Sequence, residues 1–179
     1  MKTRLLSCGL LMMVSIFFAA TAFAKDKNYT FYIGVKATES GKKIWTTGVI
    51  PFISIADTEK ELSRLQKPNE KVIKENHINL VISYPLKKEF IFRLRSKKGF
   101  TRKQLVLAIS KTYKSIYAKE ELTSKQKVVP VNERKGLINR NKTNGYYGIY
   151  GHDIGDLDLA SIKVKYIDGK VYIYLDVQS

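Results

Sequence analysis

Hydrophobic and polar residues alternate in several stretches of the chain, and this period of two predicts β-strands. The first such stretch covers residues 29–36, and a second covers residues 44–49 after a turn at residues 39–42. Pro51 then ends regular strand pairing or marks an edge strand. We expect the two stretches to pair with each other as a hairpin.

A second hairpin is predicted where residues 78–84 and 90–94 alternate on either side of a turn at residues 85–88. Along the later strand, Arg93 and Arg95 alternate with apolar residues. Successive side chains of a strand point to opposite faces of the sheet, so we expect both arginines to point to solvent.

The C-terminal stretch predicts a third hairpin together with its register. Asp168-Gly169 favours a tight two-residue turn between strands. Pairing outward from that turn makes one face apolar, with the pairs Tyr166–Val171, Val164–Ile173 and Ile162–Leu175.

The other face of this hairpin is expected to carry a ladder of lysines and tyrosines, with Lys165 opposite Tyr172 and Lys163 opposite Tyr174. Aromatic rings stack on planar groups and ammonium groups attract phosphates, so such a ladder could bind single-stranded nucleic acid or sugars. Cross-strand pairs of this kind also stabilise an exposed sheet face without binding anything.

Two helices are predicted, one long and one short. Thr101 and Gln104 have the spacing of a capping box, and apolar residues then recur at helical spacing over residues 102–121. Asp57 is placed to cap a short helix over residues 58–66. We therefore expect an α+β fold: an antiparallel β-sheet built from hairpins, with the long amphipathic helix packed on one face.

Residues 1–24 have the features of a secretory signal peptide. A basic start precedes an uncharged apolar run over residues 5–23, which closes on the small-x-small sequence Ala-Phe-Ala. A membrane anchor is the competing interpretation, because the run is about long enough to cross a bilayer. The cleavage-like ending favours export. We expect a single domain over residues 25–179, without a membrane span, in the periplasm of a bacterium or secreted from it.

The composition is strongly basic, with 32 Lys and Arg residues against 16 Asp and Glu residues and a formal net charge of +16. Such a surplus attracts polyanions, so an anionic macromolecule or an envelope component is the expected partner. Scattered lysines that only keep the protein soluble are the alternative explanation. The single cysteine, Cys8, falls in the signal peptide. The exported domain is then expected to be a monomer held by its core, without disulfides or thiol chemistry.

A basic loop follows the long helix. Its cations include Arg134, Lys135, Arg140 and Lys142, in a run with weak periodicity. Loops of this length are often functional, and arginine forks with backbone amides can bind phosphate. A solvated connector between two elements is the alternative interpretation.

Residues 145–159 are the most unusual stretch, because glycines, aromatic residues and carboxylates are concentrated there. His152 and Asp153 could form an acid/base pair in which the carboxylate orients the imidazole. Asp153, Asp156 and Asp158 could instead bind a divalent cation, calcium or magnesium, although the ligand order of an EF-hand is absent. A third interpretation is a glycine-built turn whose aspartates cap amides or pair with the basic loop.

Part of this stretch resembles a sequence block in a group of uncharacterised microbial proteins. The block reads Gly-Ile-aromatic-Gly-His-Asp-x-x-Asp-Leu and corresponds to residues 148–157, preceded here by residues 140–145. The helix start Phe-Thr-x-x-x-Leu at residues 100–105 is similar to those proteins as well. The resemblance covers the C-terminal half of the chain. It implies no activity and no role for any residue.

Together, these patterns favour a non-catalytic exported basic protein that binds an anionic partner. The candidate binding residues come from the basic loop and the ladder: Arg134, Lys135, Arg140, Lys142, Lys163, Lys165, Tyr172 and Tyr174. The alternatives are a small secreted hydrolase that uses His152 and Asp153, and a structural protein that binds a divalent cation, the one cofactor the sequence suggests.

Overall fold

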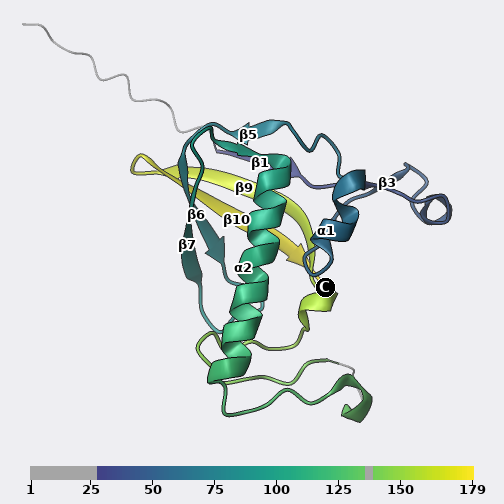
Figure 1. Ribbon diagram of the computed structural model, residues 1–179, viewed down its shortest axis with the longest axis vertical. Coiled ribbons are helices and arrows are strands. Elements are labelled where there is room, and N and C mark those ends of the chain that lie inside the picture. Colours follow the sequence, from purple (N-terminus) through teal and green to yellow (C-terminus); the bar gives the residue numbers. More distant parts are fainter. Residues whose placement is uncertain (1–27, 136–138) are drawn as a thin grey trace, which may run out of the picture.

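The computed structural model describes residues 28–135 and 139–179. The predicted signal peptide and its cleavage site lie outside the described residues. The described part folds as an α+β structure in which one mixed sheet is crossed by one long helix (Figure 1).

The central sheet has the strand order β1-β9-β10-β6-β7, and β4 pairs with the start of β9. All neighbours are antiparallel except β10 and β6, which run parallel. The strands are β1 (Tyr29–Tyr32), β4 (Ile53–Ser54), β6 (His77–Ile82), β7 (Phe90–Arg95), β9 (Asp158–Ile167) and β10 (Lys170–Gln178).

Two small antiparallel pairs lie beside this sheet. One joins β2 (Val35–Lys36) to β3 (Val49–Ile50), and the other joins β5 (Lys71–Ile73) to β8 (Phe100–Thr101). The second pair leads directly into the long helix, so it positions the start of that helix over the sheet.

Helix α2 (Arg102–Thr123) covers one face of the sheet (Figure 1). Its predicted capping box is confirmed. The backbone N–H of Gln104 donates to Thr101 Oγ1 at 3.3 Å, and the backbone N–H of Thr101 donates to the Gln104 side-chain oxygen Oε1 at 2.8 Å. The short helix α1 (Thr58–Glu61) continues as a 3-10 turn over Leu62–Arg64, and the Asp57 side chain makes no capping hydrogen bond. Three further 3-10 turns cover Gly41–Lys43, Val131–Glu133 and Ile154–Asp156.

The core lies between α2 and the face of the sheet that it covers. Apolar side chains of the two layers are fully buried there: Leu80, Ile82, Ile162, Val164 and Ile173 from the sheet, with Leu105, Ile109, Tyr113 and Ile116 from the helix. Alternation along each strand therefore sends the polar side chains to the opposite face, which the described part of the chain leaves open. None of the helices described is long and apolar enough to cross a lipid bilayer.

Two of the three predicted hairpins are confirmed. Strands β9 and β10 pair in the expected register, and Asp168 and Gly169 both have positive φ angles, 48° and 69°, as the tight turn requires. Strands β6 and β7 also form a hairpin.

The first predicted hairpin is wrong over most of its length. Strand β1 pairs with β9, and only the two short strands β2 and β3 pair as expected. Ile44 lies in a turn and is 77% exposed. Pairing with β9 lets β1 join the main sheet next to the buried residues Ile162 and Val164.

Candidate functional site

The first glycines of the unusual stretch serve the packing of α2. The carboxylate of Glu120, near the end of that helix, is fully buried and accepts hydrogen bonds from the amides of Gly145, Tyr147 and Gly148 at 2.7, 2.8 and 3.0 Å. Burial by itself raises the pKa of Glu120. Hydrogen bonds from the Thr143 side chain and from these three amides outweigh burial, so its pKa lies below the ordinary value.

Asp153 binds the basic loop through two ion pairs. Its Oδ2 accepts from Arg134 Nη1 at 2.7 Å and its Oδ1 from Arg140 Nη1 at 3.3 Å, and the two arginine side chains are only 6% and 3% exposed. Burial favours a raised pKa for Asp153, but the two guanidinium groups hold its pKa below the ordinary value. The Arg140 guanidinium also lies 5.2 Å from the centre of the Tyr117 ring. The two arginines therefore stabilise the fold.

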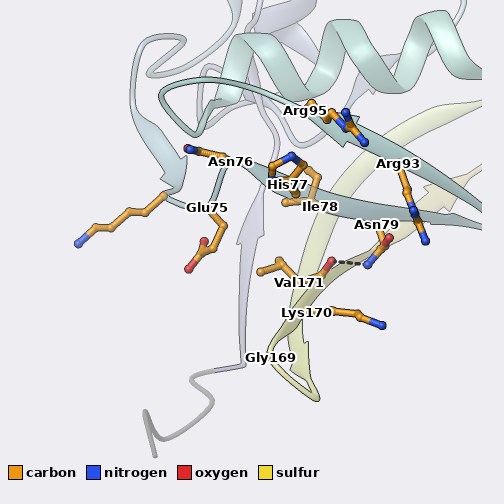
Figure 2. Close-up of a pocket in the computed structure, with 11 residues that line it drawn as sticks. Glu75, Asn76, His77, Ile78, Asn79, Arg93, Arg95, Gly169, Lys170 and Val171 are labelled. Atoms are coloured by element: carbon orange, nitrogen blue, oxygen red, sulfur yellow. Dashed lines mark hydrogen bonds between the residues drawn. The ribbon is translucent and has the colours of Figure 1, made fainter. Parts of the chain in front are cut away.

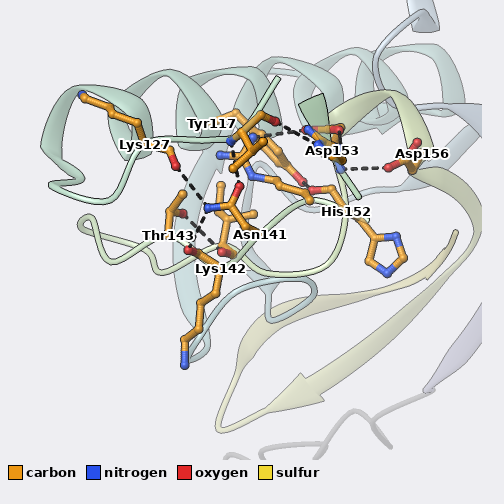
Figure 3. Close-up of polar contacts among 12 residues, drawn as sticks. Tyr117, Lys127, Asn141, Lys142, Thr143, His152, Asp153 and Asp156 are labelled. Carbon is orange, nitrogen blue, oxygen red and sulfur yellow. Dashed lines mark hydrogen bonds and ion pairs between the residues drawn. The ribbon is translucent and has the colours of Figure 1, made fainter. Parts of the chain in front are cut away.

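The structure does not bring His152 and Asp153 together as an acid/base pair. Figure 3 shows the imidazole of His152 pointing away from the Asp153 carboxylate. The imidazole packs beside Tyr84, with 5.5 Å between ring centres, and its Nε2 lies 3.4 Å from Ser179 Oγ. The His-Asp doublet that suggested a hydrolase thus has its two side chains engaged in different surroundings.

The three aspartates that could have formed a cation site have different structural roles. Asp156 accepts the Asp153 amide at 2.8 Å and closes the 3-10 turn (Figure 3). Asp158 lies in β9, where burial first and the charge of Glu61 second raise its pKa. Within residues 28–135 and 139–179, no three His, Asp or Glu side chains gather in a way that could hold a metal ion.

Some of the remaining residues of the basic loop form hydrogen bonds within it, and others are exposed to solvent. Asn141 Oδ1 accepts the Val129 amide at 2.8 Å, and its Nδ2 donates to the Lys127 carbonyl at 3.1 Å, so Asn141 ties the two arms of the loop together. Lys135 and Lys142 are exposed. Of the four loop cations predicted to bind an anion, only these two lysines present their charge to solvent.

The lysine-tyrosine ladder is present as predicted. The register sets Lys165 opposite Tyr172 and Lys163 opposite Tyr174, and Lys165 Nζ lies 4.7 Å from the centre of the Tyr174 ring. The same row continues across the sheet, because Tyr172 pairs with Asn79 and Asn79 pairs with Arg93. We call this uncovered side the open sheet face; it carries His77, Asn79, Arg93, Arg95, Lys163, Lys165, Lys170, Tyr172 and Tyr174.

A groove of about 640 Å³ opens at one end of this face, where the β9–β10 turn approaches β6 and β7 (Figure 2). The parallel ladder between β10 and β6 covers only Tyr172–Tyr174, and before it the Asn79 side chain donates to the Val171 carbonyl at 3.2 Å. The groove is lined by side chains of both strands and of β7, among them His77, Asn79, Arg93, Arg95 and Lys170.

The arginines of the groove differ from the other arginines of the described chain. Four of the six ion-pair with a carboxylate: Arg64 with Glu61, Arg102 with Glu70, and Arg134 and Arg140 with Asp153. Arg93 and Arg95 are exposed, and neither pairs with a carboxylate of a described residue. Both line the groove. The alternation of β7 predicted their exposure, but no local signal showed that β10 would lie on the other side of β6.

Two carboxylates lie near the cations of this face. Glu75 lines the groove and accepts from the Tyr166 hydroxyl at 2.9 Å, and Asp176 accepts from Ser161 Oγ at 3.2 Å. Neither forms an ion pair with the described cations of the face, so Arg93, Arg95, Lys163 and Lys170 have no carboxylate in ion-pair contact within the described chain.

Comparison of the chain with protein-family models, with curated proteins and with solved structures found no match.

Proposed function

We propose that this chain is an exported, monomeric, non-catalytic protein that binds an anionic partner through the open sheet face. The observation that carries the proposal is the pair of exposed arginines Arg93 and Arg95, which have no carboxylate partner among the described residues and lie on the same face as the lysine-tyrosine ladder. Cations placed side by side without counter-charges repel one another and add little to stability. They attract a polyanion, because an anionic partner supplies the missing counter-charge.

The arrangement of aromatic and basic residues supports the same proposal. Tyr172 and Tyr174 lie on the central strand β10, with Lys163 and Lys165 on one neighbouring strand. Arg93 belongs to the strand beyond β6 on the other side. A chain laid across this face meets aromatic rings in the middle and cations on either side, as proteins that bind extended polyanions require.

The proposal is tested by measuring polyanion affinity across a salt series. The purified protein is titrated with heparin and with a single-stranded oligonucleotide, and the double variant Lys163→Glu/Lys165→Glu is compared with Lys103→Glu/Lys111→Glu. The control pair has the same charge change but lies exposed on α2, on the far side of the sheet (Figure 1). We expect the ladder variant to lose about tenfold or more in affinity and the control less than about threefold.

Two results would overturn the proposal: no binding of either polyanion at low salt, or an equal loss of affinity in the two double variants. The second result would show that net charge alone, and no particular face, attracts the polyanion.

Export is tested separately. Mass spectrometry of the protein recovered from the periplasm or medium of an expressing bacterium should give a chain that begins at Lys25, since the predicted cleavage follows Ala24. Recovery of the full-length chain in the membrane fraction would support the anchor interpretation instead.

A further inference from the structure

We infer that the groove at the end of the open sheet face is a binding site for a phosphate monoester group. The inference rests on the proposed function, because it names the chemical group of the anionic partner that this face recognises. It adds a defined ligand pocket to a surface that otherwise attracts polyanions by charge.

The groove follows from the way the sheet is assembled. Strands β10 and β6 pair over only three residues each, and Gly169 of the β9–β10 turn lines the groove together with residues at the start of β6 (Figure 2). Asn79 bridges the two strands by its bond to the Val171 carbonyl. The volume of about 640 Å³ lies within the range of small-ligand sites, about 300–1,000 Å³.

The side chains of the groove are mainly cationic hydrogen-bond donors. Arg93 and Arg95 are two residues apart on one strand, so their Cα atoms are separated by about 7 Å along the same face. Their cross-strand neighbours are Asn79 and His77, and Lys170 belongs to the opposite wall. Two guanidinium forks and an ammonium group can therefore converge on one anion from two sides.

This set of donors fits a phosphate monoester better than a carboxylate. A carboxylate has two oxygens and is satisfied by one guanidinium fork. A phosphate monoester has three terminal oxygens and a charge between about −1.5 and −2 at neutral pH, so it can accept from both forks and from Lys170 together.

Inorganic phosphate is the first probe. The purified protein is titrated with sodium phosphate and, at matched ionic strength, with sodium chloride, while backbone amide shifts are followed by NMR. We expect saturable shifts at the amides of the groove, including Asn79 and Lys170, with phosphate alone. Shifts that follow ionic strength, or that are spread evenly over the exposed lysines, would overturn the inference.

A pair of variants separates the groove from the rest of the face. Arg93→Gln/Arg95→Gln should weaken phosphate binding by at least about tenfold, because two charge-assisted hydrogen-bonding groups are lost. Lys163→Gln/Lys165→Gln removes the same charge from the ladder and should change phosphate binding less than about threefold. Thermal unfolding checks that both variants fold. If phosphate binding is equal in the two folded variants, the groove is not the site.

Two further arms distinguish the source of the phosphate. A 5′-phosphorylated oligonucleotide is compared with the same oligonucleotide bearing a 5′-hydroxyl, and phosphatidic acid vesicles are compared with phosphatidylglycerol vesicles of equal surface charge. A preference for the monoester in either arm that the Arg93→Gln/Arg95→Gln variant abolishes supports the groove. Polyanion binding without any such preference would leave the proposed function intact and reject the phosphate site.

Discussion

Arg134 donates to Asp153, with 2.7 Å between Nη1 and Oδ2, and this bond joins the basic loop to the glycine-rich stretch. The same carboxylate also accepts from Arg140, whose side chain is almost completely buried. One aspartate thus neutralises part of the charge of two buried arginines. The segment that most resembled a catalytic motif in the sequence is therefore held in place by structural ion pairs.

Replacing Asp153 by Asn should destabilise the protein by about 3 kcal/mol, because both buried guanidinium groups lose their counter-charge. Urea unfolding followed by circular dichroism measures the change. Asp57→Asn is the matched control, since it breaks an ion pair with Lys60 whose two side chains are 76% and 54% exposed. That control variant should leave the free energy of unfolding almost unchanged, because water screens an exposed ion pair. Equal stability of the two variants would contradict a structural role for Asp153.

Gly145→Ala should destabilise the protein by about 1–3 kcal/mol. A Cβ atom at this position would lie 2.7 Å from both the carboxylate and the backbone carbonyl of Glu120, so the amides that bind Glu120 would have to move. Gly155→Ala is the control, because a Cβ there meets nothing within 4 Å. Its unfolding free energy should change by less than about 0.5 kcal/mol. A tolerated Gly145→Ala would show that the Glu120 contacts adapt without cost.

Stability should fall in acid as Glu120 and Asp153 take up protons. The pKa of each lies below its ordinary value in the folded protein, so each contributes stability above the unfolded-state pKa, about 4.5 for Glu120 and 3.8 for Asp153. That contribution is lost as the pH drops through the folded-state pKa. Urea midpoints measured from pH 6 to pH 2 should decrease below about pH 4.5, and less steeply in Glu120→Gln, which has no proton to bind there. A parallel pH profile in this variant would contradict the assignment.

Asp158 should behave in the opposite way. Burial and Glu61 raise its pKa, so its charge opposes folding once the pH rises above its unfolded-state value of about 3.8. Asp158→Asn should therefore increase stability near neutral pH, on the order of 0.5 kcal/mol after solvent screening, and have no effect below that value. Thermal melts at pH 3 and pH 7 make the comparison. A loss of stability at pH 7 would instead indicate that the Asp158 carboxylate bonds to a group that it stabilises.

Local features of the fold could be predicted from the sequence because the residues that determine them are neighbours in it. The Asp168-Gly169 turn fixes the register of β9 and β10, and Thr101 with Gln104 fixes the start of α2. The β1–β9 and β10–β6 pairs join segments far apart in the chain. Alternation shows which face a residue occupies, but it carries no information about which strand will lie beside it.

The same limit applies to the candidate site. The ladder of Lys163, Lys165, Tyr172 and Tyr174 was predictable because a single hairpin contains it. The groove was not, since Arg93 and Lys170 line the same groove only because β10 pairs in parallel with β6. For Asp153 the sequence offered three interpretations, and the observed one depends on Arg134, which is 19 positions away.

Strand β10 follows every one of its sheet partners in the sequence, yet it lies between β9 and β6. Strands β1 and β9 on one side of β10 form no hydrogen-bonded pair with β6 and β7 on the other side. A nascent chain therefore holds two separate parts of the sheet until β10 emerges. Such long-range closure slows folding compared with a sheet built from neighbouring strands. In a chain threaded through a translocation pore from its N-terminus, the central sheet could therefore close on the far side only after β10 has passed through.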